Sequence, residues 1–214
     1  MAYRKVILAN DEIYHVLNRG VEERITFEDK RDYRRFIDSF VYYQKANPPA
    51  RFSFRKRVKK EKLKGDNLVE IICYCLMPNH FHFLLKQVKE RGISLFIGRL
   101  VNSYTRYFNT RHRRSGHLFQ GPFRAVRITS EQQLLHVSRY IHLNPFVGFL
   151  VKDLRDYPYS SYLEYLGLSQ NSFCSPEIVL NQFSSREEYE KFVLDQKDYA
   201  LNLKKIEKAI LESL

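Results

Sequence analysis

The chain has 214 residues, of which 44% are hydrophobic and 31 are Phe or Tyr, so its length and composition predict a folded domain and exclude a disordered chain. The 36 Lys and Arg exceed the 24 Asp and Glu, and the net charge of +12 suits a polyanion such as nucleic acid. The alternative is a basic protein kept soluble by charge repulsion. No apolar run approaches the ~20 residues of a membrane span, and the N-terminal apolar segment is too short for a secretory signal.

The three cysteines form no even disulfide framework, which fits a reducing cytoplasm. Cys73 and Cys75 lie two apart in a strand-like run, so we expect both to pack as small apolar groups. A Cys-x-Cys zinc site is the alternative, although no second pair accompanies it.

The first elements in chain order are a strand and a helix. Residues 13–18 alternate as a strand that ends before Gly20, and Arg19 at its end is a candidate phosphate contact. His15 either approaches a functional site or is a buried structural histidine. Residues 27–43 have helical apolar spacing and stop before a Pro-Pro pair.

Residues 51–65 carry eight Lys or Arg against one Glu, with two Phe among them. The candidate phosphate contacts here are Arg55, Lys56 and Arg57, and the Phe rings could stack on bases. The alternative is a solvated basic loop.

Two strands then form a predicted hairpin, residues 68–76 and the run that starts at His80, joined by a short turn. Because strand side chains alternate, His80 and His82 share one face, and Phe81 and Phe83 share the other. Two imidazoles on one face can hold one metal ion. The alternative is a half-buried strand whose polar face happens to be histidine.

A helix is predicted over residues 93–109, followed by a basic turn. Its spacing favours core packing for Tyr104 and Tyr107 over a nucleophilic role. Further candidate phosphate contacts are Arg99, Arg106, Arg111, Arg113 and Arg114.

After a predicted strand at residues 123–128, Ser130 begins a helix with a capping pattern. Tyr140 and Asn144 lie one turn apart on it, and Pro145 is expected to leave Asn144 at a frayed helix end. A phenol beside an amide oxygen, both facing the histidine strand, could supply a nucleophile and a third metal ligand. The alternative is an exposed tyrosine and an asparagine that ends a helix.

Five motifs in this order resemble the single-tyrosine transposases of the HUH endonuclease superfamily, in particular the branch of REP-associated tyrosine transposases. They are Tyr14-His-Val-x-Asn-Arg-Gly20, Met77-Pro-Asn-His-x-His-x-Leu-Leu85, Gly116-His-Leu-Phe-Gln-Gly-Pro-Phe123, Arg139-Tyr-Ile-His-Leu-Asn-Pro145 and Tyr157-Pro-Tyr-Ser-Ser161. The resemblance covers about residues 14–167. The stretch at residues 51–65 and the chain after residue 168 lie outside it.

The resemblance implies an α+β fold, a ferredoxin-like antiparallel sheet with helices on it. We expect a catalytic domain at residues 1–168, with a basic insertion at about 48–66, and a C-terminal helical appendage at 169–214. In that appendage Ser185 opens a helix with a capping pattern, and residues 204–214 have amphipathic spacing.

The resemblance also implies an activity, which is cleavage and rejoining of single-stranded DNA, often beside a hairpin. Tyr140 would be the nucleophile, and His80, His82 and Asn144 would hold a divalent metal, Mg²⁺ or Mn²⁺. Free tyrosine has a pKa of ~10, so a base or cation must assist it. A homodimer is possible, because some relatives give the tyrosine helix to the partner's site. The alternatives are a non-cutting nucleic-acid-binding descendant and a hydrolase that acts through water.

Overall fold

The computed structural model describes residues 6–48, 51–53 and 65–201, and within them a four-stranded antiparallel sheet lies at the centre. The strand order is β2-β3-β1-β4, which is the ferredoxin-like arrangement, so the predicted α+β fold is confirmed. The strands are β1 (Ile13–Arg19), β2 (Val69–Met77), β3 (His80–Gln87) and β4 (Arg124–Arg127).

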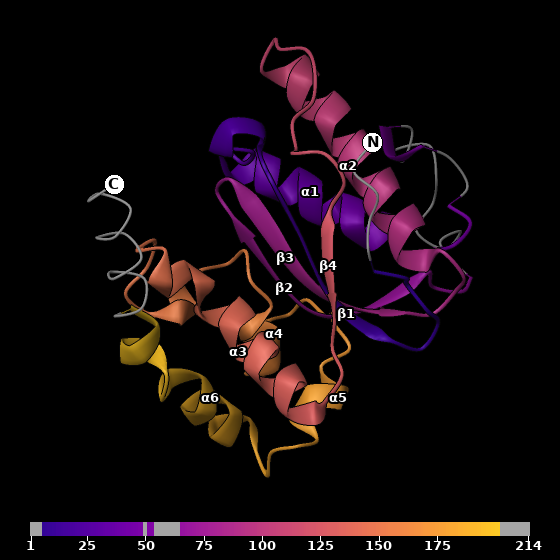
Figure 1. The fold of residues 1–214 in the computed structure, drawn as a ribbon. Coiled ribbons are helices and arrows are strands. Elements are labelled where there is room, and N and C mark those ends of the chain that lie inside the picture. Colours follow the sequence, from indigo (N-terminus) through magenta and orange to yellow (C-terminus); the bar gives the residue numbers. More distant parts are fainter. Residues whose placement is uncertain (1–5, 49–50, 54–64, 202–214) are drawn as a thin grey trace.

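Helices cover both faces of the sheet (Figure 1). On one side lie α1 (Lys30–Tyr43) and α2 (Gly92–Arg111), and on the other lie α3 (Glu131–Val147), α4 (Tyr162–Tyr165), α5 (Glu177–Leu180) and α6 (Arg186–Leu194). The short 3₁₀ turns are Val21–Glu23 and Leu154–Asp156.

The alternation of β3 divides the core into two clusters. Phe81 and Phe83 are fully buried against α1 and α2, whereas Leu84 packs with the α3 side. The register pairs His82 with Leu17 of β1 and with Cys75 of β2, so His82 faces α3. The two aromatic rings therefore anchor one face of the strand in the core, and the face with the histidines is turned toward the α3 layer.

The predicted hairpin of β2 and β3 is confirmed, and Cys73 and Cys75 are buried free thiols. Burial raises the pKa of both thiols, so they pack as neutral, apolar groups, as expected. The glycine after β1 is required by space, because a Cβ on Gly20 would lie 2.3 Å from the carbonyl oxygen of Arg24.

Two predicted helix boundaries were wrong. The first helix begins at Lys30, because the Asp29 side chain accepts hydrogen bonds from two backbone N–H groups and caps it there. The tyrosine helix continues through Pro145 to Val147. Proline removes one hydrogen bond but not the next, and Gly148 N–H still donates to the Asn144 carbonyl at 2.8 Å. Asn144 therefore lies inside the helix rather than at a frayed end.

The C-terminal helices pack on α3. Val179, Tyr189 and Val193 are fully buried in the cluster that contains Ile141 of α3. Ser185 accepts a hydrogen bond from Glu188 N–H and caps α6, as its sequence pattern predicts. The predicted amphipathic segment at 204–214 lies outside the described residues. Within the described part of the chain, no helix has the length and apolar character that crossing a membrane needs.

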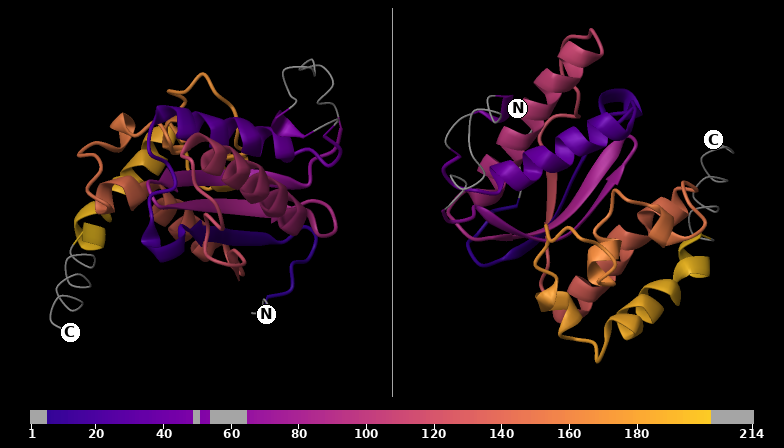
Figure 2. Two further views of the ribbon diagram at one scale, coloured as in Figure 1. Left: turned by 90° about the horizontal axis from the view of Figure 1, so that it is seen from above. Right: turned by 180° about the vertical axis from the view of Figure 1, so that it is seen from behind.

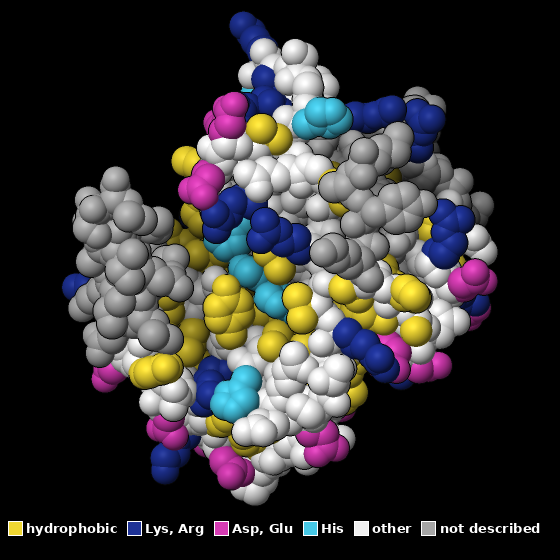
Figure 3. Space-filling view, viewed as in Figure 1, with side chains coloured by type: hydrophobic (Ala, Val, Ile, Leu, Met, Phe, Trp, Pro, Cys, Tyr) yellow, Lys and Arg dark blue, Asp and Glu magenta, His cyan; other side chains and the backbone are white. Residues whose placement is uncertain are grey.

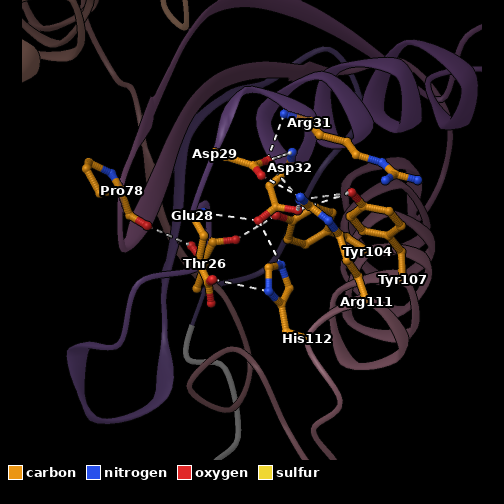
Figure 4. Close-up of polar contacts among 10 residues, drawn as sticks. All are labelled: Thr26, Glu28, Asp29, Arg31, Asp32, Pro78, Tyr104, Tyr107, Arg111 and His112. Carbon is orange, nitrogen blue, oxygen red and sulfur yellow. Dashed lines mark hydrogen bonds and ion pairs between the residues drawn. The ribbon is translucent and has the colours of Figure 1, made fainter.

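A buried carboxylate joins α1 to α2 (Figure 4). Asp32 has no exposed surface, and it accepts hydrogen bonds from Arg111 at 2.5 Å, from Tyr107 at 3.1 Å and from Glu28 N–H at 3.0 Å. His112 Nε2 lies 3.0 Å from Oδ2 of Asp32, the same oxygen that accepts from Glu28 N–H. These partners offset the cost of burying the charge and fix the end of α2 against the start of α1.

We predict that Asp32→Asn lowers the free energy of unfolding by about 3 kcal/mol, because Arg111 and His112 lose a buried anionic partner. Urea denaturation at pH 7 measures this. The matched control is Asp11→Asn, which removes an exposed ion pair to Lys86 and is expected to cost less than about 1 kcal/mol. Equal effects of the two substitutions would contradict the role of Asp32.

Candidate active site

A pocket of about 460 Å³ lies where β1 and β3 meet the loop before β4 and the exposed face of α3. The residues that line it are Leu17, Asn18, Arg19, His80, His82, Gln120, Gly121, Pro122, Arg124 and Tyr140. Figure 3 shows histidine side chains gathered near the middle of this face, with Lys or Arg beside them. Four of the predicted site residues, Arg19, His80, His82 and Tyr140, thus lie in one pocket of one chain.

The pocket is built around four rings. The ring centroids of Tyr140 and His82 are 5.5 Å apart, and the planes are perpendicular at 89°. The centroid of His15 is 5.9 Å from that of Tyr140 and 5.1 Å from that of His82. His80 and His82, which share a strand face, have centroids 4.9 Å apart. The phenol ring therefore packs edge-on against the imidazoles.

A hydrogen bond links the two central imidazoles. His15 Nε2 lies 2.9 Å from His82 Nδ1, so one of these nitrogens donates and the other accepts. Burial lowers the pKa of His15 to about 4. Burial, together with charges from His80, His15 and Arg19, also lowers the pKa of His82 well below its usual value. Both rings are thus neutral near pH 7. His15 was expected either to approach a functional site or to be a buried structural histidine. The structure supports the first interpretation, because His15 contacts both His82 and Tyr140.

His82 Nε2 is suited to a metal. It is a buried nitrogen without a hydrogen-bond partner, which is costly unless a ligand occupies it. If the Nδ1 proton is donated to His15, Nε2 presents a lone pair, and a neutral imidazole lone pair is what a divalent metal binds. His80 Nδ1 lies 2.6 Å from the Asn79 side-chain oxygen, which fixes that ring as well. The two imidazoles therefore fit the predicted metal.

The third predicted ligand is less well placed. The Asn144 side-chain nitrogen donates to the Tyr140 carbonyl at 2.8 Å, and Asn144 does not line the pocket. In the described residues, no three His, Cys, Asp or Glu side chains converge on a possible metal position.

The tyrosine helix is held by a buried histidine. His142, two residues after Tyr140, lies 2.8 Å from the Tyr189 hydroxyl of α6 and 2.8 Å from the Ser161 hydroxyl. Ser161 in turn bonds to the backbone of Tyr74 in β2. These contacts connect α3 to α6 and to the sheet, and they leave Tyr140 on the opposite side of α3, 52% exposed.

The predicted phosphate contacts fall into separate places. Arg19 lines the pocket and forms an ion pair with Glu23 at 2.5 Å. Arg99, Arg106 and Arg111 line a groove between α1 and α2 instead. Arg113 and Arg114 lie in the turn after α2, where Arg114 donates to Asn109 at 2.6 Å. The remaining three candidates, Arg55, Lys56 and Arg57, lie outside the described residues.

The polar pocket residues that sequence reasoning missed include Gln120 and Arg124. Strand alternation could have found Arg124, because it pairs with Leu17, which itself pairs with His82, so all three share one face. Gln120 lies in a loop, and its place depends on a backbone hydrogen bond from its N–H to the Arg19 carbonyl at 2.7 Å. No periodicity in the sequence predicts that contact.

Comparison with known families matches residues 51–144 to the model described as Transposase IS200 like. The matched segment includes both pocket histidines and Tyr140. Over these residues the chain is similar to the IS200-like transposases. Comparison with curated proteins found no match for this chain.

The chain also shares its fold with a solved structure of a REP-associated tyrosine transposase bound to a REP hairpin. The TM-score is 0.58 at 14% sequence identity, and the alignment covers 82% of this chain and 98% of that chain. At this identity the likeness concerns the fold.

The buried His142 predicts a pH dependence of stability. Burial lowers its pKa from 6.5 to about 3. Between pH 6.5 and pH 3 the unfolded chain therefore binds a proton at this histidine and the folded chain does not. Stability is complete above pH 6.5 and is lost as the pH falls toward 3. One such group costs about 2 kcal/mol between pH 7 and pH 5.

We predict that His142→Gln, which cannot take up this proton, reduces the pH 7 to pH 5 loss of unfolding free energy by about 2 kcal/mol. Urea denaturation at both pH values measures the difference. His117→Gln changes an exposed histidine and serves as the control, with the wild-type loss retained. An unchanged loss in His142→Gln would show that His142 is not kept neutral by burial.

Proposed function

We propose that this protein cleaves and rejoins single-stranded DNA through a covalent bond between Tyr140 and a 5′-phosphate. The observation that carries the proposal is the approach of the Tyr140 ring to within 5.5 Å of His82, with both side chains in one pocket. Core packing does not explain this contact, because Tyr140 is 52% exposed. The tyrosine and both imidazoles come from the same chain, so this arrangement needs no partner subunit.

In the first step, Tyr140 Oη attacks the phosphorus of a phosphodiester and loses its proton. The bond from phosphorus to the 3′-oxygen breaks, and that oxygen takes up a proton to leave a free 3′-hydroxyl. In the second step, a 3′-hydroxyl attacks the phosphotyrosine, re-forms a phosphodiester and releases the phenol. The number of phosphoester bonds is constant, so no ATP is consumed.

The residues that would hold a divalent cation are His80, His82 and Asn144. Mg²⁺ or Mn²⁺ bound there would polarise the phosphate and stabilise negative charge in the transition state. The role of His15 is to position His82, since their 2.9 Å hydrogen bond orients the ring and sets which nitrogen carries the proton. His15 is therefore a positioning residue.

The substrate we propose is single-stranded DNA flanked by a hairpin, in line with the REP hairpin bound to the structural relative. Arg19 and Arg124 line the pocket beside Tyr140 and are placed to bind the phosphates next to the cleaved one. Guanidinium groups suit this role, because they bind phosphate oxygens in pairs.

Tyr140→Phe is expected to abolish formation of a denaturation-resistant protein–DNA adduct, because only the attacking hydroxyl is lost. The assay incubates the protein with Mn²⁺ and end-labelled single-stranded DNA that carries a hairpin, followed by denaturing electrophoresis. Binding of the same DNA in EDTA should change less than about twofold.

The control for this experiment is Tyr199→Phe, which removes a hydroxyl from a tyrosine that is 62% exposed and outside the pocket. It should retain the adduct. Adduct formation by Tyr140→Phe at the wild-type rate would refute the nucleophile. Cleavage without any adduct in the wild type would favour hydrolysis by water instead.

His80→Ala and His82→Ala are each expected to weaken Mn²⁺ binding by about 10-fold or more and to remove Mn²⁺-dependent adduct formation. Electron paramagnetic resonance of free Mn²⁺ gives the affinity without any reaction. His117→Ala removes an exposed histidine as the control. Wild-type Mn²⁺ affinity in both pocket variants would contradict the metal assignment.

A further inference from the structure

An open groove of about 1130 Å³ lies on the outer surface of α1 and α2. Figure 2 shows these two helices side by side, on the side of the sheet away from α3. The groove is therefore separate from the pocket of Tyr140. Its volume exceeds the ~300–1,000 Å³ of most small-molecule sites.

Arginine dominates this groove. Six of its fifteen lining residues are arginines, and none of those fifteen is Asp or Glu. The arginines are Arg31, Arg35, Arg51, Arg99, Arg106 and Arg111. Asn102, Ser103 and Thr110 add neutral polar side chains between them. Cations gathered in one concave surface raise the local potential and attract anions.

Neutral acceptors hold two of these cations in place. Arg99 donates to the carbonyl oxygen of Ala46 at 2.9 Å. Arg35 donates to the Ser103 hydroxyl at 3.2 Å and to the Ser39 hydroxyl, and its guanidinium lies 4.0 Å from the centroid of Phe52. Such contacts fix a guanidinium without cancelling its charge.

Some arginines outside the groove are instead paired with carboxylates. Arg127 pairs with Glu12 at 2.5 Å, and Arg155 pairs with Glu190 at 2.6 Å. Within the groove, Arg111 has this kind of partner, in Asp29 and Asp32. Asp38 also acts electrostatically on Arg35. The remaining arginines give the groove a positive charge, and two of them, Arg35 and Arg99, are oriented by neutral groups of the protein.

We propose that this groove binds the phosphate backbone of a DNA segment other than the strand that reaches Tyr140. Several guanidiniums and neutral hydrogen-bond donors in one groove suit successive phosphates, which the protein would bind without reading base sequence. The choice of DNA as the polyanion rests on the proposed function. The positive groove itself does not.

The test uses Arg31→Ala/Arg106→Ala, because both side chains are exposed and line opposite walls of the groove. Fluorescence anisotropy measures the Kd of hairpin-flanked single-stranded DNA for the full chain in EDTA, from 50 to 400 mM NaCl. Two lost phosphate contacts should raise Kd at least about tenfold near 0.1 M salt. The slope of log Kd against log salt should fall by about 1.4 to 1.8.

The matched control is Lys152→Ala/Lys191→Ala, which removes two positive charges on the side of α3 and α6. It should leave the salt slope unchanged. Equal changes in the two double variants, or no change in the groove variant, would overturn the inference. The adduct assay on the wild type is independent of this result. If the wild type forms no adduct but the groove variant shows the smaller salt slope of Kd, the proposed cleavage is refuted and the proposed DNA binding in the groove is supported.

Discussion

The hydrogen bond between His15 Nε2 and His82 Nδ1 is the contact on which the active-site account depends. It joins the two central strands on the face that meets α3, and it leaves His82 Nε2 buried without a hydrogen-bond partner. Burial keeps both rings neutral, so the nitrogen that remains can bind a cation rather than repel it. The opposite face of the same strand carries Phe81 and Phe83, whose burial fixes the strand's register and thereby the side of the sheet on which both histidines lie.

The second requirement is that α3 carries its exposed tyrosine to this face and keeps it there. His142 holds α3 in this position through buried hydrogen bonds to Tyr189 of α6 and to Ser161. It lies on the other side of the helix from Tyr140. The C-terminal helix α6 therefore helps to position the phenol. The proposed reacting groups lie on the α3 side of the sheet, and the arginine-rich groove lies on the α1–α2 side.

Sequence reasoning found the elements whose signal is local. Alternation in the strand of His80 and His82 gave its two faces, and the Ser130 cap gave the start of α3. It failed where a contact between residues far apart in the sequence sets the position of a side chain. Gln120 is an example, because its place depends on a hydrogen bond to the Arg19 carbonyl. It also grouped arginines by charge alone, whereas the structure separates Arg19 in the pocket from Arg99 in the groove. Pro145 was misjudged because one missing N–H does not end a helix whose next hydrogen bonds are made.

Mass spectrometry of the covalent adduct tests the central claim most directly. Wild-type protein is incubated with Mn²⁺ and single-stranded DNA, and the adduct is digested with nuclease and then trypsin. The account predicts a nucleotide remnant on Tyr140, in the tryptic fragment that ends at Lys152. A remnant on any other residue would contradict the account, as would DNA cleavage with no modified peptide.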